Sequence, residues 1–207
     1  NPNVAAELAA FNQKFGLPAC TSVTIPTNAA LPLAAAPTTG CVLSVVYTTS
    51  SGVMTGAAPA YDSGWSTEIS LDVQWAHATA PLARIVLIEA PDASVNSLAA
   101  AVNLANAMGK GVVSMSFGAQ EGSWGASFDG AFGSANMSYV ASTGDSGAAV
   151  NWPAVSSKVL AIGGTSLTYT SGGTRSEVVW SSAGGGASAY TARPAYQSAS
   201  VPGLGGG

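Results

Sequence analysis

The chain has 207 residues, 47% of them apolar, and a formal net charge of −4 at pH 7. This length fits one large domain with a sizeable core. Only six basic and ten acidic side chains are present, far below the usual quarter of a sequence. The lack of a basic patch argues against nucleic-acid binding, and no apolar run is long enough to span a membrane.

Low charge also fits a protein that must survive acid, because few carboxylate pairs are lost when the pH falls. A compositional bias toward Ala and Gly would give the same pattern.

Cys20 and Cys41 are the only cysteines, and they flank a Pro- and Thr-rich loop. Two cysteines that close such a loop predict a disulfide and a secreted, extracellular protein. The alternative is a pair of buried thiols. No signal peptide is present, so we expect a secreted chain to be already processed.

Helical and strand patterns alternate along the chain. We predict helices at 1–15, 65–80, 95–108 and 123–134, strands at 42–47, 84–89, 111–117, 139–142 and 159–162, and a hairpin after Thr165. This order is typical of an α/β domain, here spanning 1–207, with a mostly parallel sheet and helices on both faces. In such sheets, functional residues lie at the carboxyl ends of the strands.

The segment 65–80, WSTEISLDVQWAHATA, holds the most informative residues. We predict a helix that Ser66 or Thr67 caps. At about 100° per residue, Glu68 and Asp72 fall inside its apolar arc, one turn apart. Burial and a like charge disfavour ionising the second carboxyl group, so the two should titrate as a unit. The alternative is a mis-phased helix whose acids are solvated at its edge.

Three other polar residues are weaker candidates. Asp145 lies between glycines in STGDSG at a strand end, where it is accessible, although an Asx-turn explains it equally well. Ser166 follows Gly-Gly-Thr, but the hairpin pattern after it argues against a nucleophile. His77, the only histidine, lies on the polar back of the helix and is interpreted as a solvated surface residue. We expect no Cys–His zinc cluster and no calcium loop, hence no metal site in this chain.

Four motifs in order resemble one family. EISLDVQW followed by AP, then SMSFG, STGDSGA and VLAIGGTSL are similar to the sedolisins, the serine-carboxyl peptidases, which have a subtilisin-like fold. The resemblance runs from Asn1 to Gly207, and the closing SAGGGASAYTARPAYQ fits it too. It implies a subtilisin-like, mostly parallel sheet.

The resemblance also implies roles for individual residues. Glu68 matches the general base of a nucleophilic serine, and Asp72 the aspartate that orients it. Asp145, in the segment 142–147, matches the aspartate of the oxyanion hole. The segment Ser116, Phe117 and Gly118 matches the lining of the substrate cleft. A carboxylate base suits acid because an imidazole would already be protonated there.

The family nucleophile lies in a second GGTS-like motif nearer the C-terminus, and this chain has no match to it. The family's calcium-binding loops also lie there, so we expect any calcium on that segment. We expect the serine on a missing or separate segment, and a second, associated chain that carries it as the partner. The third explanation for the absent nucleophile motif is that the chain is an inactive remnant of a peptidase.

The sequence therefore predicts an acid-acting serine-carboxyl endopeptidase that cleaves unfolded proteins. The alternative is an inactive peptidase remnant that acts as a secreted binding module. A glycosidase that uses Glu68 and Asp72 is disfavoured, because neighbours on one helix face cannot flank a sugar.

Overall fold

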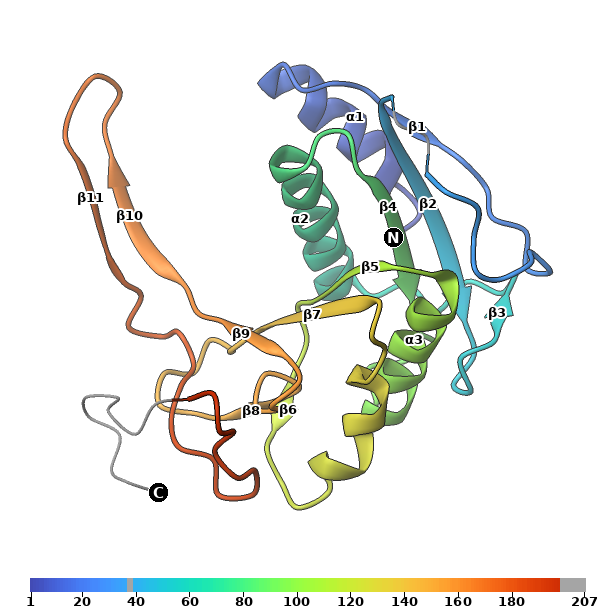
Figure 1. Cartoon of the computed structure of the whole chain (residues 1–207). Coiled ribbons are helices and arrows are strands. Elements are labelled where there is room, and N and C mark those ends of the chain that lie inside the picture. The colour runs from blue at the N-terminus through green and yellow to red at the C-terminus, as the bar shows by residue number, and fades with distance from the viewer. Residues whose placement is uncertain (37–38, 198–207) are drawn as a thin grey trace. The chain divides into compact units, whose positions relative to one another are not determined.

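The computed structural model describes residues 1–36 and 39–197 (Figure 1). The chain divides into two compact units, Asn1–Gly109 and a second unit that starts at Lys110. Each unit has its own sheet of parallel strands.

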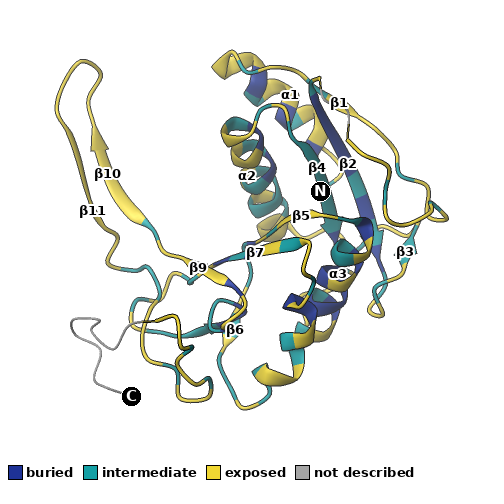
Figure 2. Ribbon diagram, viewed as in Figure 1, coloured by how far each residue is buried: buried dark blue, intermediate teal, exposed yellow. Residues whose placement is uncertain are grey.

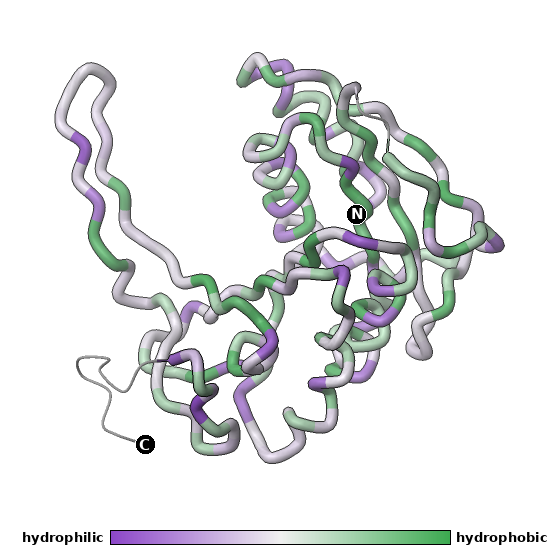
Figure 3. The backbone as a smooth tube through the Cα atoms, in the orientation of Figure 1, coloured by the Kyte–Doolittle hydropathy of each residue, from purple (hydrophilic) through white to green (hydrophobic). Residues whose placement is uncertain are grey.

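The sheet of the first unit is built around β2 (Cys41–Thr48). β1 (Cys20–Ser22) and β4 (Arg84–Glu89) pair with it in parallel, and β3 (Met54–Thr55) pairs with its end antiparallel. The β2–β4 register runs from Val42 opposite Arg84 to Tyr47 opposite Glu89. Both strands are rich in β-branched residues, and Figure 3 shows their apolar stretches.

Helices cover both faces of this sheet. α1 (Val4–Phe15) and α2 (Ser63–Thr79) contribute Val4, Leu8 and Val73 to a core cluster with Leu43. α3 (Val95–Met108) contributes Leu104 and Met108 to a second cluster with Val46. Successive strand residues point to opposite faces, so odd positions of β2 and β4 meet α1 and α2 and even positions meet α3. Figure 2 shows β2 buried between these layers.

Local sequence signals set the helix ends. Gly16 ends α1 with a left-handed φ of 65°, a conformation that glycine adopts without strain. The Ser94 side chain accepts from the Ser97 amide and caps α3, which ends at Gly109. α2 begins earlier than predicted, because the Asp62 side chain, rather than Ser66 or Thr67, accepts from the Trp65 amide at 2.9 Å.

The second unit holds the parallel strands β5 (Gly111–Met115), β7 (Met137–Ser142) and β9 (Leu160–Ile162), in that order. β6 (Ala119–Gln120) and β8 (Asn151–Trp152) form a short antiparallel pair. β10 (Thr165–Tyr169) and β11 (Arg175–Val179) form the predicted hairpin.

One face of the second sheet carries the core of this unit. Met115, Tyr139 and Ala141 are buried there, and Phe132 at the end of η1 (Gly125–Phe132) packs on Tyr139 at 5.5 Å between ring centroids. The opposite face exposes Val112, Leu160 and Ile162. The helix predicted at 123–134 is present as the shorter 3₁₀ helix Gly125–Phe132.

The mixed α/β class and the parallel pairing are confirmed, with four helices in the described residues. Within those residues, every helix is too short or too polar to cross a membrane.

Candidate active site

α2 positions Glu68 and Asp72, and its orientation differs from the sequence prediction. Its buried residues are Val73, which belongs to the predicted apolar arc, and His77, which belongs to the predicted polar back. Val73 and Ile69 of the predicted apolar arc pack in the core of the first unit. The rest of that arc is turned outward, with Trp65, Leu71 and Trp75 exposed. The interpretation of His77 as a solvated surface residue is wrong, because its exposed fraction is 0%.

Polar partners explain why this face is buried. The Asn1 side-chain amide donates to the Ser66 carbonyl at 3.1 Å and to the Ser70 hydroxyl at 2.9 Å. Ser70 in turn donates to Glu7 on α1. These bonds satisfy groups that would otherwise be costly to bury. The hydrogen bond from Ser70, then that from Asn1, holds the pKa of Glu7 below its usual range.

Glu68 and Asp72 are half-buried and lie one turn apart on the outward side of α2. At about 100° per residue both lie roughly opposite Ser66 and His77. Trp75 is 59% exposed beside them. Both acids therefore lie on an accessible, partly aromatic face, where a substrate could meet them.

Asp145 is exposed on the loop that follows β7. Gly144 and Gly147 have φ values of 94° and 66°, which an L side chain would adopt only with strain. The Gly184 amide donates to the Gly144 carbonyl at 2.9 Å, and the Gly147 amide to the Ser182 carbonyl at 2.9 Å. The loop is thus fixed by its backbone on both sides of Asp145.

Contact with Gly184 is especially close. A Cβ at this position would lie 1.9 Å from the Thr143 carbonyl oxygen, so only glycine fits without a backbone shift. The Gly-rich run near the C-terminal end is thereby explained: it allows the chain to pass directly beside the Asp145 loop.

The segment Ser116, Phe117 and Gly118 connects β5 to β6. The Phe117 ring lies 6.1 Å from the buried Trp152 ring, and a Cβ at Gly118 would lie 3.0 Å from the Trp152 carbonyl oxygen. The segment therefore rests on β8.

Asn151 joins this segment to the Asp145 loop, and the sequence analysis does not identify it. Its backbone pairs with Gln120, and its side-chain amide donates to the Thr143 carbonyl at 3.0 Å. The structure thus brings the predicted cleft lining and the predicted oxyanion segment together within one unit. An Asn that precedes Trp-Pro at a short strand gives no sequence signal of its own.

Glu121, also not identified from sequence, extends this network. Its carboxylate accepts from the Ser188 hydroxyl at 2.5 Å and from the Ala189 amide at 3.0 Å. The Ser188 oxygen accepts from the Tyr190 and Thr191 amides. Glu121 therefore anchors the Gly-rich segment next to the predicted cleft lining.

Ser166 lies opposite Val178 in the exposed β10–β11 hairpin. The hairpin prediction is confirmed, and with it the main reason for not assigning this serine as a nucleophile.

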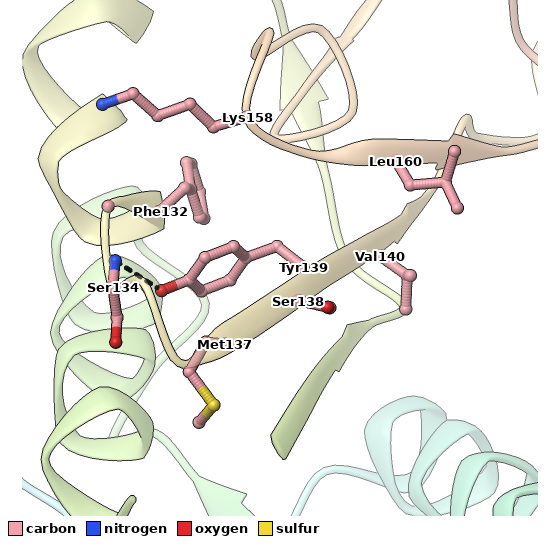
Figure 4. A pocket seen from close by; sticks show the side chains of 9 residues that line it. Phe132, Ser134, Met137, Ser138, Tyr139, Val140, Lys158 and Leu160 are labelled. Carbon is pink, nitrogen blue, oxygen red and sulfur yellow. Dashed lines mark hydrogen bonds between the residues drawn. The ribbon is translucent and has the colours of Figure 1, made fainter. Parts of the chain in front are cut away.

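A cavity of about 580 Å³ opens in the second unit. Figure 4 shows its lining by η1, β7 and β9, with Tyr139 accepting a hydrogen bond from the Ser134 amide at 3.1 Å. The lining contains Lys158 and no carboxylate, so none of the predicted catalytic residues lies in it.

The predicted disulfide joins Cys20 and Cys41. The expectation of no Cys–His zinc site stays a prediction, because both cysteines are joined in the disulfide, although His77 lies beside them. One ring nitrogen of His77 and the two sulfur atoms all lie within 4.8 Å of one another.

Comparison with known proteins identifies the family of this chain. A scan of protein-family models found no match, but the chain belongs to the sedolisin family of serine-carboxyl peptidases. It is 34% identical over 166 residues to kumamolisin of Bacillus sp. (strain MN-32), across 68% of this chain and 30% of that protein.

The solved structure of Pseudomonas sedolisin, a serine-carboxyl proteinase complexed with two molecules of pseudo-iodotyrostatin, is also similar. The TM-score is 0.70 at 25% identity, over 99% of this chain and 59% of that one. The chain therefore spans less than two thirds of the length of either relative.

Proposed function

We propose that this chain is the larger, non-nucleophile part of an acid-acting serine-carboxyl endopeptidase that cleaves unfolded proteins. The observation that carries the proposal is the pair Glu68 and Asp72, half-buried and one turn apart on the outward face of α2. Family membership supports it.

Glu68 is the proposed general base and Asp72 the residue that orients it. Neighbouring carboxyl groups share protons over part of the acid range, so one can accept a proton where a histidine is already charged. The nucleophilic serine belongs to a segment outside residues 1–207, on the same protein or on an associated second chain. The calcium-binding loops that the family resemblance implies are proposed to lie on that segment too.

Asp145 is the proposed hydrogen-bonding residue of the oxyanion hole. Its exposed side chain and fixed backbone suit this role, since a donor must be held in place before charge develops. Ser116, Phe117 and Gly118 are proposed to line the cleft, where main-chain groups pair with an extended peptide. The proposed fold is subtilisin-like, with a mostly parallel sheet, and the chain forms one partial peptidase domain.

The disulfide supports a secreted, extracellular protein. Peptides and unfolded proteins are the proposed substrates. Pseudo-iodotyrostatin, which the Pseudomonas structure contains, is a suitable active-site probe.

The test is hydrolysis of an unfolded protein by the whole purified protein, whose polypeptides are first identified by denaturing mass spectrometry. We expect cleavage at pH 4, little at pH 8, and inhibition by pseudo-iodotyrostatin. Glu68→Gln and Asp145→Asn should each lower kcat at least about 100-fold, the size typical of a lost base or oxyanion donor.

Glu177→Gln is the matched control, because Glu177 lies on the exposed hairpin and pairs only with Arg175 and Thr165 among the contacts described. It should leave kcat unchanged. Strong activity at pH 8 with none at pH 4 would contradict the proposal.

The second candidate is a secreted binding module derived from a peptidase. The exposed aromatic side chains of Trp65 and Trp75 favour it. Such a module would show no hydrolysis with its full set of polypeptides present, and Glu68→Gln would leave it unchanged or slightly more stable.

A further inference from the structure

Three potential metal ligands meet at one corner of the first unit. Cys20 begins β1 and Cys41 begins β2, and the two residues are direct partners in the parallel register. His77 lies near the end of α2. One of its ring nitrogens and both sulfur atoms lie within 4.8 Å of one another. Cys41 is 2% exposed, whereas Cys20 is half-buried, which gives solvent an approach.

The hydrogen bond of His77 leaves one nitrogen available. Nε2 lies 2.8 Å from the Pro18 carbonyl oxygen. A carbonyl only accepts, so Nε2 carries the hydrogen, and in the neutral ring the lone pair is on Nδ1. Within the described residues, Nδ1 is buried and has no hydrogen-bond partner.

This arrangement is the one that metal-binding histidines use. Such a histidine donates its other N–H to a backbone carbonyl or carboxylate, which fixes the tautomer and the ring orientation. An unpaired acceptor in a protein interior is otherwise costly.

We propose that reduction of the Cys20–Cys41 disulfide converts this corner into a Zn²⁺ site formed by both thiolates and His77 Nδ1. A phosphine or dithiol reductant supplies two electrons, the S–S bond breaks, and each sulfur takes one proton. Zn²⁺ then binds both sulfurs, and the two protons are released to solvent. Water from the Cys20 side is the fourth ligand.

Charge favours zinc over a monovalent ion. Two thiolates and Zn²⁺ sum to zero, which lowers the cost of burial, whereas Cu⁺ would leave a net negative charge. Two Cys, one His and a water is an established zinc ligand set. The bound ion would take over from the disulfide in joining residues 21 positions apart. The proposal does not depend on the proposed peptidase activity.

The experiment uses the whole protein, stripped of metal and reduced with a phosphine under argon. Co²⁺ is titrated first, as a visible probe of thiolate coordination, and Zn²⁺ then displaces it. We expect one Co²⁺ per chain with a sulfur-to-cobalt charge-transfer band and two protons released per Co²⁺, and no further proton release when Zn²⁺ displaces it. The oxidised protein should bind neither ion at this site.

Cys41→Ser should abolish the charge-transfer band of a two-thiolate site. His77→Phe should lower Zn²⁺ affinity at least about tenfold, since even the loss of an outer partner of a ligand costs 10–100-fold. Because His77 is buried and its replacement could unfold the chain, X-ray absorption of the zinc-loaded wild type provides a measurement without substitution.

A zinc shell of two sulfurs and one imidazole supports the proposal. A shell without imidazole, more than two sulfurs, or no binding by the reduced protein would overturn it.

Discussion

The two parallel sheets of this chain are stabilised differently. The β2–β4 sheet has helices on both faces, and each face has its own core cluster. The β5–β7–β9 sheet buries Met115, Tyr139 and Ala141 on one face and exposes Val112, Leu160 and Ile162 on the other. The first unit is therefore held mainly by side-chain packing, as parallel sheets usually are.

The functional loops of the second unit depend on something else. The Asp145 loop is held by backbone hydrogen bonds to 182–185 and by the close approach of Gly184. Packing can fix a helix such as α2, whereas an exposed carboxyl group on a turn needs its main chain anchored on both sides. Core substitutions should therefore destabilise the first unit most. Glycine substitutions should perturb the predicted oxyanion segment most.

The largest effect is expected in the core of the first unit. Leu43 on β2 is 2% exposed and packs against α1 and α2. Leu43→Ala should lower the free energy of unfolding by about 2–5 kcal/mol. Leu160→Ala is the matched control on the exposed face of the other sheet and should stay within about 0.5 kcal/mol.

Urea denaturation measures both variants. A cost at Leu160 as large as that at Leu43 would break the comparison, because it would mean that this face is covered in solution.

A smaller effect is expected at the Gly-rich segment. Gly184→Ala places a Cβ against the Thr143 carbonyl, and such overpacking costs about 1–3 kcal/mol. Gly185→Ala is the control, because a Cβ there meets no atom within 4 Å. If Asp145 acts as proposed, Gly184→Ala should also lower kcat more than it raises KM.

Equal loss of stability in the two alanine variants would show that the close approach does not hold the loop. Loss of stability in Gly184→Ala with unchanged kcat would count against the role of Asp145.

The longer elements could be predicted from the sequence. The strand 84–89 and the helix 95–108 match the structure, because an apolar run, a capping Ser94 and a closing Gly109 are local signals. The sequence patterns do not predict β1, β3, β6 and β8, because these strands of two or three residues exist only through their partners.

The candidate site could be predicted only in part. Glu68, Asp72 and Asp145 stand out from spacing and glycine context, and their proposed roles rest on the family resemblance. The sequence does not predict the orientation of α2 correctly, because periodicity counts Ser70 and His77 as surface residues. Asn1, Glu7 and Pro18 provide the hydrogen bonds that allow this face to be buried, and these are contacts between segments distant in sequence.

The smallest effect concerns Glu7, whose pKa is held below its usual range first by the Ser70 hydroxyl and then by Asn1. A carboxyl group with a lowered pKa in the folded state stabilises the fold above its unfolded pKa. That contribution is lost as the pH falls through the folded pKa, on the acid side of the usual glutamate range. As the pH falls, a protein that works in acid would retain this contribution to a lower pH than it would retain that of an ordinary ion pair.

Glu7→Gln should therefore remove about 0.5 kcal/mol near neutral pH, since a partly exposed group is screened by water, and less at pH 2–3. Thermal unfolding from pH 3 to 7 measures the difference. Ser70→Ala removes the main cause of the shift and should reproduce most of this pH dependence, so the double variant should lose less than the sum of the single losses. Additive losses would mean that the helices α1 and α2 are not coupled through this contact, and that packing alone orients the Glu68 and Asp72 face.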